Sequence, residues 1–203
     1  MTFYKRRERF TGLSVKIGMV FAKFGLSPNQ WTLVTILPAL VAVWFLVKDQ
    51  FLWAALFFFI AAFIDLIDGS VARVTGRVTK LGAYLDTVID RYVEGIIVFG
   101  LLFANLPALP VFGLNIPVYV WIFLYFFGGM MTTYAKAAAK EKELVGKELK
   151  GGLIERAERL IILFIGILLA YFDPFYLTYI IIILAALANV SALQRIYIAS
   201  RSE

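Results

Sequence analysis

The stretch Asp65-Leu-Ile-Asp68-Gly69-Ser-Val-Ala72-Arg73 is followed, eight residues later, by Gly82-Ala-Tyr-Leu-Asp86-Thr-Val-Ile-Asp90. Asp65 and Asp68 are three residues apart, which places them on one face of a helix. Asp86 and Asp90, four residues apart, share a face in the same way. The surrounding sequence is apolar enough to span a bilayer, where an unpaired carboxylate is costly. Four such charges on two neighbouring helices predict a bound cation, and magnesium is the default among hard divalent ions.

Hydrophobic residues make up 62% of the 203 residues, and the mean hydropathy is +0.84. This composition is typical of an integral membrane protein. The chain has no cysteine, which excludes disulfides and thiolate metal sites, and no histidine, which leaves carboxylates as the natural proton acceptors. The net charge of +6 arises beside hydrophobic segments. It therefore indicates anionic headgroups, phosphorylated substrates and topology signals rather than nucleic acid.

Residues 2–25 combine apolar residues at helical spacing with six basic residues. This pattern predicts a helix that lies in the membrane interface. A soluble amphipathic helix packed on a domain is the alternative, although no soluble domain follows. The run Gly25-Leu-Ser27-Pro28 is expected to end the helix, and Ser27 or Asn29 can cap the next one.

Six hydrophobic segments follow, each near the twenty or so residues that cross the hydrocarbon core. They lie at about 31–47, 51–73, 82–105, 114–139, 152–172 and 174–197. We therefore expect an all-α integral membrane protein, a single domain over residues 1–203 in which the interfacial helix precedes a six-helix bundle at 31–197. Pro38 and Pro117 are expected to kink or begin spans.

Basic residues gather in alternate connections. The N-terminal segment holds six, the connection at 73–80 three and the connection at 136–150 five, whereas the connections at 105–113 and near Asp173 hold none. The positive-inside rule then places both termini in the cytoplasm, with the aspartate motif near that face. We expect a multi-pass protein of the cell membrane whose active site faces the cytoplasm.

The pattern Asp-x2-Asp-Gly-x2-Ala-Arg-x8-Gly-x3-Asp-x3-Asp resembles the signature of the CDP-alcohol phosphotransferase family and matches all eight fixed positions. The resemblance extends over the whole chain, from the interfacial helix through the six spans. It implies a magnesium-dependent enzyme that transfers a phospho-alcohol group from a CDP-linked lipid donor to an acceptor hydroxyl and releases CMP. It also implies a protein that is surrounded by membrane lipids and is commonly a homodimer.

The resemblance further implies roles for individual residues. Two Mg²⁺ ions, which Mn²⁺ can replace, would be held by Asp65, Asp68 and Asp86, with Asp90 contributing to the second ion. Asp90 would also be the catalytic base that deprotonates the acceptor hydroxyl. Contacts to the CDP portion would come from Gly69, Arg73 and Thr79, and from the segment Asn29-Gln30-Trp31-Thr32. Ala72 and Gly82 would be the small residues that allow close approach.

Basic residues later in the chain indicate a phosphorylated acceptor. Arg156 and Arg159 are one helical turn apart, and with Lys136 they can form a cationic pocket for a phosphate. The Glu-Arg-x2-Arg pattern resembles the family branch that uses inositol 1-phosphate, the phosphatidylinositol-phosphate and archaetidylinositol-phosphate synthases. In that branch the acceptor-binding positions correspond to Thr133, Lys136, Arg156, Arg159 and Arg195. Ala138 departs from the branch, which often has a second basic residue there, and snorkelling at the membrane edge is the alternative role for Arg156 and Arg159.

The sequence leaves other functions open. A di-inositol-phosphate-phosphate synthase would keep the acceptor and use CDP-inositol as donor, and glycerol phosphate or serine would be alternative acceptors. A cation transporter is the non-enzyme alternative, which broken helices in two related halves would support. The acidic residues instead cluster at one place. Release of CMP from a CDP-linked donor would distinguish an enzyme from a transporter.

Overall fold

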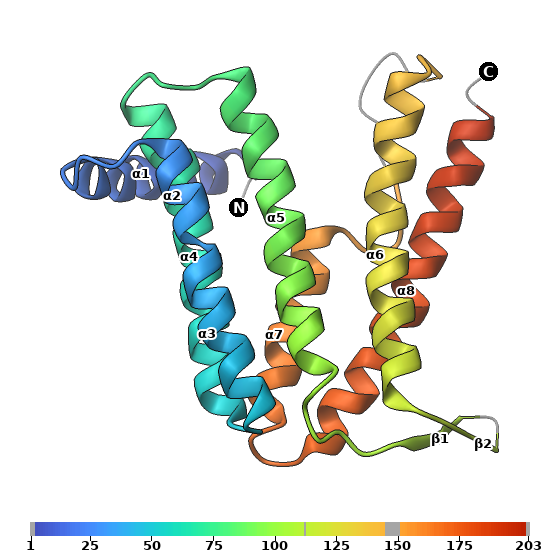
Figure 1. Cartoon of the computed structure of the whole chain (residues 1–203). Coiled ribbons are helices and arrows are strands. Elements are labelled where there is room, and N and C mark those ends of the chain that lie inside the picture. Colours follow the sequence, from blue (N-terminus) through green and yellow to red (C-terminus); the bar gives the residue numbers. More distant parts are fainter. Residues whose placement is uncertain (1–2, 112, 145–150, 202–203) are drawn as a thin grey trace. The chain divides into compact units, whose positions relative to one another are not determined.

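The computed structural model describes residues 3–111, 113–144 and 151–201, which form helices and one short β-hairpin (Figure 1). The elements in chain order are α1 (Phe3–Ala22), α2 (Pro28–Val34), α3 (Ile36–Val47), α4 (Phe51–Val74), α5 (Lys80–Leu101), β1 (Leu109–Val111), β2 (Leu114–Ile116), α6 (Val118–Glu141), α7 (Arg156–Leu169) and α8 (Pro174–Ser200). The strands pair antiparallel, with Leu109 opposite Ile116.

Contacts between residues divide the chain into two compact units. Unit 1 comprises Met1–Trp44 and Leu56–Ile97, and unit 2 comprises Phe45–Ala55 and Val98–Glu203. The aspartate motif belongs to unit 1, whereas the residues predicted to bind the acceptor belong to unit 2. That the whole chain acts as a single domain stays a prediction.

The turn between α1 and α2 has the form that the sequence predicts. Gly25 has a φ of 74°, a left-handed backbone that glycine adopts at low cost after a helix. The Ser27 hydroxyl accepts a hydrogen bond from the Gln30 N–H at 3.3 Å, and Gln30 Oε1 accepts one from the Ser27 N–H at 2.7 Å. This reciprocal pair is a capping box, so Ser27 is the cap that α2 uses.

The first predicted span is interrupted at one residue. Helix α2 ends at Val34 and α3 begins at Ile36, while the Thr35 hydroxyl donates to the Thr32 carbonyl at 2.6 Å. Pro38 explains the break, because it has no N–H to offer the Val34 carbonyl and its ring crowds that group. The interruption lies where Pro38 was expected to disturb the span, and a bend of the helix axis at this place stays a prediction.

Helix α1 lies across α4 within unit 1 (Figure 1). A Cβ on Gly18 would lie 2.5 Å from the Ser70 carbonyl oxygen, so this approach requires glycine. Apolar side chains of α1 pack on a buried cluster formed by Trp31, Ile67 and Val71. A helix therefore occupies the predicted N-terminal segment and is joined to the motif helix, while its place in the membrane interface stays a prediction.

Four helical segments of the described residues are long and apolar enough to cross a membrane. They are Pro28–Val47, which joins α2 and α3, Phe51–Val74, Val118–Glu141 and Pro174–Ser200. Helix α5 has 22 residues but carries several charged side chains, and α7 has 14 residues. A helix of 14 residues is about 21 Å long, which is shorter than the hydrocarbon core. The fold is that of a helical membrane protein, and the predicted total of six spans stays a prediction.

The span predicted at 114–139 begins later than expected. Residues Leu109–Val111 and Leu114–Ile116 pair as the hairpin, and α6 starts only at Val118, directly after Pro117. Proline suits the start of a helix because its missing N–H would have no partner there in any case. Pro117 therefore begins the helix, as one of the two expected roles for it, and the hairpin is an element that the hydropathy pattern did not predict.

The span predicted at 152–172 is also shorter, because α7 covers only Arg156–Leu169. Gly151 and Gly152 have φ values of 132° and 114°, which end any helical path before Glu155 caps α7. The apolar side chains of Leu153 and Ile154 led to the earlier start, but in the structure they lie in an irregular connection.

Within unit 2, α6 and α8 lie side by side (Figure 1). A Cβ on Gly128 would lie 2.8 Å from the Asn189 backbone nitrogen, so the two helices meet at this glycine. Asn189 Nδ2 donates across the interface to the Leu124 carbonyl at 2.8 Å. Small residues and interhelical amide bonds are the usual way in which helices associate in membranes.

Candidate functional site

Three carboxylates from α4 and α5 come together in unit 1. One oxygen from each of Asp65, Asp68 and Asp86 lies within 4.8 Å of the others. Two oxygens on opposite sides of one divalent ion are separated by about 4.2 Å for Mg²⁺ and about 4.8 Å for Ca²⁺. The spacing and the all-oxygen donor set therefore fit a hard divalent cation, as the helical positions of these residues predict.

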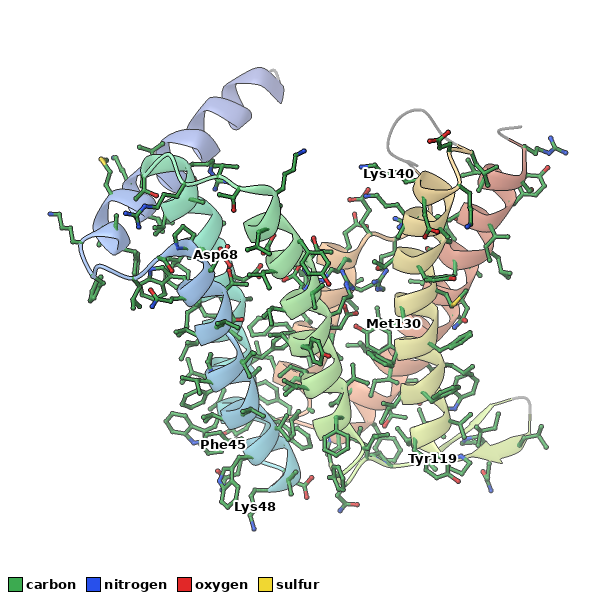
Figure 2. The ribbon with its side chains drawn as sticks, turned by 45° about the horizontal axis from the view of Figure 1, so that its top comes forward. Phe45, Lys48, Asp68, Tyr119, Met130 and Lys140 are labelled. Atoms are coloured by element: carbon green, nitrogen blue, oxygen red, sulfur yellow. The ribbon has the colours of Figure 1, made fainter. Side chains whose placement is uncertain are left out.

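Helix α2 orients the middle carboxylate of this group. Asp68 is 5% exposed, and its Oδ2 accepts the Thr32 hydroxyl at 2.6 Å. Figure 2 shows Asp68 in the part of unit 1 where α1, α2 and α4 meet. A carboxylate has about four lone-pair sites, so one bond from Thr32 leaves the group able to bind a cation.

Asp90 lies one turn beyond Asp86 on α5 and is partly exposed. It is outside the group of three carboxylates whose oxygens lie within reach of one another. Its predicted contribution to a second ion and its predicted role as the base therefore stay predictions, on a face of α5 that it shares with Asp86.

A pocket of about 390 Å³ lies beside these carboxylates in unit 1. Its size is within the usual range of about 300–1,000 Å³ for small-molecule sites. Residues predicted from the sequence form most of its lining: Asn29, Thr32, Asp68, Gly69, Ala72, Arg73, Thr79, Gly82 and Asp86. The remaining lining residues are Pro28, Arg77, Val78 and Ala83. Residues from the segment at the start of the first span and from both halves of the aspartate motif thus line the same pocket.

Glycine at position 82 keeps this pocket open. A Cβ there would lie 3.1 Å from Thr79 Oγ1 and 3.2 Å from Asn29 Oδ1, tighter than side chains normally approach. The Gly82 N–H donates to Thr79 Oγ1 at 2.9 Å, which fixes the threonine at the start of α5. A larger residue would push apart two polar groups that line the same pocket.

Gln30 and Trp31, which were predicted to contact the CDP portion, are placed differently from Asn29 and Thr32. The Gln30 side chain is exposed and forms the capping box with Ser27. Trp31 is 8% exposed and packs edge-to-face on Phe21 of α1, with ring centroids 5.5 Å apart. In the structure Gln30 caps α2 and Trp31 packs against α1, whereas their neighbours Asn29 and Thr32 line the pocket.

Sequence reasoning missed residues that surround Arg73. Arg77 lines the pocket, and a second arginine four positions after Arg73 was the available signal. Arg73 Nη2 donates to Ser14 Oγ at 2.7 Å and to Ser70 Oγ at 3.3 Å. Ser14 had no sequence signal, because it lies 59 residues from Arg73 on a helix predicted to serve only as an interfacial anchor.

In unit 2, two of the predicted acceptor residues converge on one threonine. Arg159 Nη1 donates to Thr132 Oγ1 at 3.3 Å, and Arg195 Nη1 donates to the Thr132 carbonyl at 2.9 Å. Arg195 Nε also donates to the Gly151 carbonyl at 2.9 Å, which fastens the segment before α7 to α8. Thr132 was not predicted, although its neighbour Thr133 was. Arg159 is only 1% exposed, so its guanidinium does not snorkel to a membrane edge.

The other predicted acceptor residues lie on α6 and α7. Thr133 follows Thr132 on α6 and directs its hydroxyl to the Gly129 carbonyl at 3.4 Å. Lys136 is one turn further along α6, on the segment between Met130 and Lys140, which Figure 2 labels. Arg156 is the first residue of α7, one turn before Arg159. Helices α6 and α7 thus carry four of the predicted acceptor residues, Thr133, Lys136, Arg156 and Arg159.

Comparison with known sequences identifies the protein family. The sequence model of the family described as CDP-alcohol phosphatidyltransferase matches residues 25–191. The chain belongs to this family. Members of the CDP-alcohol phosphatidyltransferase family are transferases, so the chain is an enzyme, and the cation-transporter alternative is set aside.

Individual relatives cover almost the whole chain. The archaetidylinositol phosphate synthase of Pyrococcus horikoshii is 34% identical over 188 residues, which is 92% of this chain and 90% of the relative. The crystal structure of the Mycobacterium tuberculosis phosphatidylinositol phosphate synthase with CDP-DAG bound has a TM-score of 0.80 and 25% identity, and covers 93% of this chain and 94% of its own. The structure of that synthase with manganese and citrate has a TM-score of 0.79 and 25% identity, with 93% and 89% coverage.

Proposed function

We propose that this CDP-alcohol phosphatidyltransferase moves a phosphatidyl or archaetidyl group from a CDP-linked lipid to a hydroxyl of inositol 1-phosphate and releases CMP. The observation that carries the proposal is that three carboxylates, Asp65, Asp68 and Asp86, lie within reach of one another and that two of them, Asp68 and Asp86, line one pocket with Arg73. The similarity to a named archaetidylinositol phosphate synthase supports the inositol phosphate acceptor. The donor is supported by the mycobacterial synthase, whose structure was solved with CDP-DAG bound.

The pocket residues would bind and orient the donor. Asp65, Asp68 and Asp86 would hold divalent ions, two Mg²⁺ by default, which when bound offset the charge of the donor's pyrophosphate. Thr32 keeps the Asp68 carboxylate in one orientation. Arg73 and Arg77 bring two guanidinium groups to the same pocket, and guanidinium groups bind phosphate oxygens bidentately. The manganese complex of the mycobacterial synthase supports a divalent ion of this kind.

Asp90 would act on the acceptor. As a carboxylate one turn beyond Asp86, it would take the proton from the attacking hydroxyl as the new phosphate ester bond forms. The chain has no histidine that could supply this base. CMP leaves with the electron pair of the broken phosphoanhydride bond.

The cationic residues of unit 2 would bind the phosphate of the acceptor. Arg156, Lys136 and Thr133 offer donors from α6 and α7, and Thr132 holds Arg159 from the side. Arg195 would contribute a charge while it also fastens the Gly151 segment. Such a set favours a phosphorylated polyol over serine, which has no phosphate for it to bind.

Further proposals concern the number of spans, the orientation of the enzyme in the membrane and its oligomeric state. We propose six spans, in which α5 and α7 join the four longer helices, with both termini and the metal site at the cytoplasmic face. The distribution of basic connections supports this orientation. A homodimer is proposed from the family resemblance.

The test is CMP release by the purified protein in Mg²⁺. CDP-lipid and CDP-inositol are each paired with inositol 1-phosphate, glycerol 3-phosphate and serine. Release only with CDP-lipid and inositol 1-phosphate supports the proposal. Release with CDP-inositol would instead indicate a di-inositol-phosphate-phosphate synthase, release with another acceptor would overturn the acceptor assignment, and no release with any pair would overturn the donor chemistry.

Replacing Arg156 or Arg159 by Ala is expected to raise the KM of the acceptor by about tenfold or more, because each substitution removes a charge-assisted bond to phosphate. The KM of the donor should change little, since the CDP pocket lies in unit 1. Lys140→Ala is the matched control, because Lys140 is an exposed cation at the end of α6. If the arginine variants only reduce protein yield, the residues have a structural role.

A further inference from the structure

The environment of Arg73 contains a residue that the proposed function does not use. The guanidinium lines the pocket, with Nη1 3.4 Å from the place where a Cβ on Gly69 would lie. The other terminal nitrogen, Nη2, donates to Ser14 Oγ at 2.7 Å. One end of the guanidinium is therefore at the pocket wall, and the other is bound by a residue of α1.

The number of protons that each serine hydroxyl can donate fixes the direction of the hydrogen bonds among Ser14, Ser70 and Arg73. A serine hydroxyl has one proton to donate and can accept two bonds. The Ser70 hydroxyl donates to the Leu66 carbonyl at 2.8 Å. The bond of 2.8 Å between the hydroxyls of Ser14 and Ser70 is then donated by Ser14, whose free lone pairs accept from Arg73. Each proton has a defined acceptor, so Ser14 is held as an acceptor for the guanidinium.

The close approach of α1 to α4 at Gly18 brings Ser14 near Arg73. Gly18 lies one turn beyond Ser14, and a Cβ on it would be 2.5 Å from the Ser70 carbonyl oxygen and 2.9 Å from Val74 Cγ1. Ser70 is 0% exposed at this crossing. The backbones of α1 and α4 are thus close enough for short side chains to bridge them. A serine is the right length to join α1 to Arg73 at this separation.

We infer that Ser14 is a positioning residue for the transfer reaction: it holds the Arg73 guanidinium in the orientation that binds the phosphates of the CDP-linked donor. The inference rests on the proposed function, in which Arg73 contacts the donor. A long arginine side chain loses rotamer freedom when it binds phosphate, and a bond that already restricts it reduces that loss. The N-terminal helix then contributes to donor affinity in addition to any role at the membrane surface.

The experiment compares Ser14→Ala with Ser14→Thr in the full-length protein, by the steady-state rate of CMP release. Ser14→Ala should raise the donor KM about tenfold, because the lost bond has a charged partner. The kcat and the acceptor KM should change little. Ser14→Thr keeps a hydroxyl and should restore the donor KM. Ser200→Ala is the matched control, because the Ser200 hydroxyl donates to the Tyr197 carbonyl within its own helix at 2.9 Å.

A double-mutant cycle with Arg73→Ala separates positioning from general damage to α1. In the Arg73→Ala background, Ser14→Ala should produce no further rise in the donor KM. An equal rise in both backgrounds, or equal losses in kcat and in thermal stability, would overturn the inference. So would an unchanged donor KM in Ser14→Ala when Arg73→Ala is impaired. If wild-type protein releases no CMP from any donor, the proposed function itself fails, and that result is distinct from a failure of Ser14.

Discussion

Asp68→Asn is expected to reduce CMP release by at least about 100-fold, the largest effect that we predict for a single substitution in the metal site. The change keeps the size of the side chain but removes a negative charge from a group of three carboxylates. Asp68 is 5% exposed and is bonded by Thr32, so the new amide cannot turn freely to present its oxygen. A neutral side chain at this position weakens the attraction for a divalent ion as well as its coordination.

The measurement combines activity with metal binding. CMP release is titrated with Mn²⁺ and with Mg²⁺, and the affinity of the protein for Mn²⁺ is measured by electron paramagnetic resonance of the free ion. Asp173→Asn is the matched control, because the Asp173 side chain caps α8 by accepting from the Phe175 N–H at 2.9 Å, and asparagine caps equally well. An Asp68→Asn protein with normal Mn²⁺ affinity and normal turnover would show that Asp68 is not a metal ligand.

Much of the candidate site could be predicted from the sequence because its chemistry is local to helices. The spacing of Asp65 and Asp68 places them on one face, and a matching spacing on the next helix adds Asp86. Arg73 follows on the same helix as Asp68, and both line the pocket. Periodicity and residue type therefore identified the side chains that meet, since few alternatives place so many charges in an apolar segment.

The contacts between helices could not be predicted in this way. Ser14 meets Arg73 only because Gly18 lets α1 approach the backbone of α4, and nothing in the spacing of either helix announces that crossing. Thr132 is a similar case, because this residue of α6 accepts hydrogen bonds from Arg159 of α7 and from Arg195 of α8. A small polar residue in an apolar helix carries no sign of which partner it meets until the packing is known.

The limits of the spans were obscured by apolar residues outside helices. Leu114 and Ile116 extend the apolar run before α6, yet they belong to a hairpin strand. Leu153 and Ile154 do the same before α7, where Gly151 and Gly152 have left-handed backbones. Hydropathy measures transfer into an apolar phase and not backbone conformation, so it cannot separate a short strand or an extended connection from the first turn of a span.

Asp90→Asn is expected to lower kcat by at least about 100-fold while the donor still binds, because general-base catalysis contributes on this scale. The substitution leaves the group of Asp65, Asp68 and Asp86 intact, and these residues with the pocket would hold the donor. Equilibrium binding of the CDP-linked lipid in Mn²⁺, without acceptor, measures the second half of the prediction. Asp49→Asn is the control, since Asp49 has a φ of 54°, which asparagine tolerates, and accepts from the Asn105 N–H through a side-chain oxygen that asparagine retains.

The two roles predicted for Asp90 give different results in this experiment. A residue that acts only as the base affects turnover and leaves the affinities for donor and Mn²⁺ nearly unchanged. A residue that also completes a second metal site reduces the number of Mn²⁺ ions bound per chain, and donor affinity falls with it. Normal turnover in Asp90→Asn would remove Asp90 from both roles. Counting the Mn²⁺ ions bound per chain in the wild-type protein and in Asp90→Asn therefore distinguishes the base role from the additional metal role.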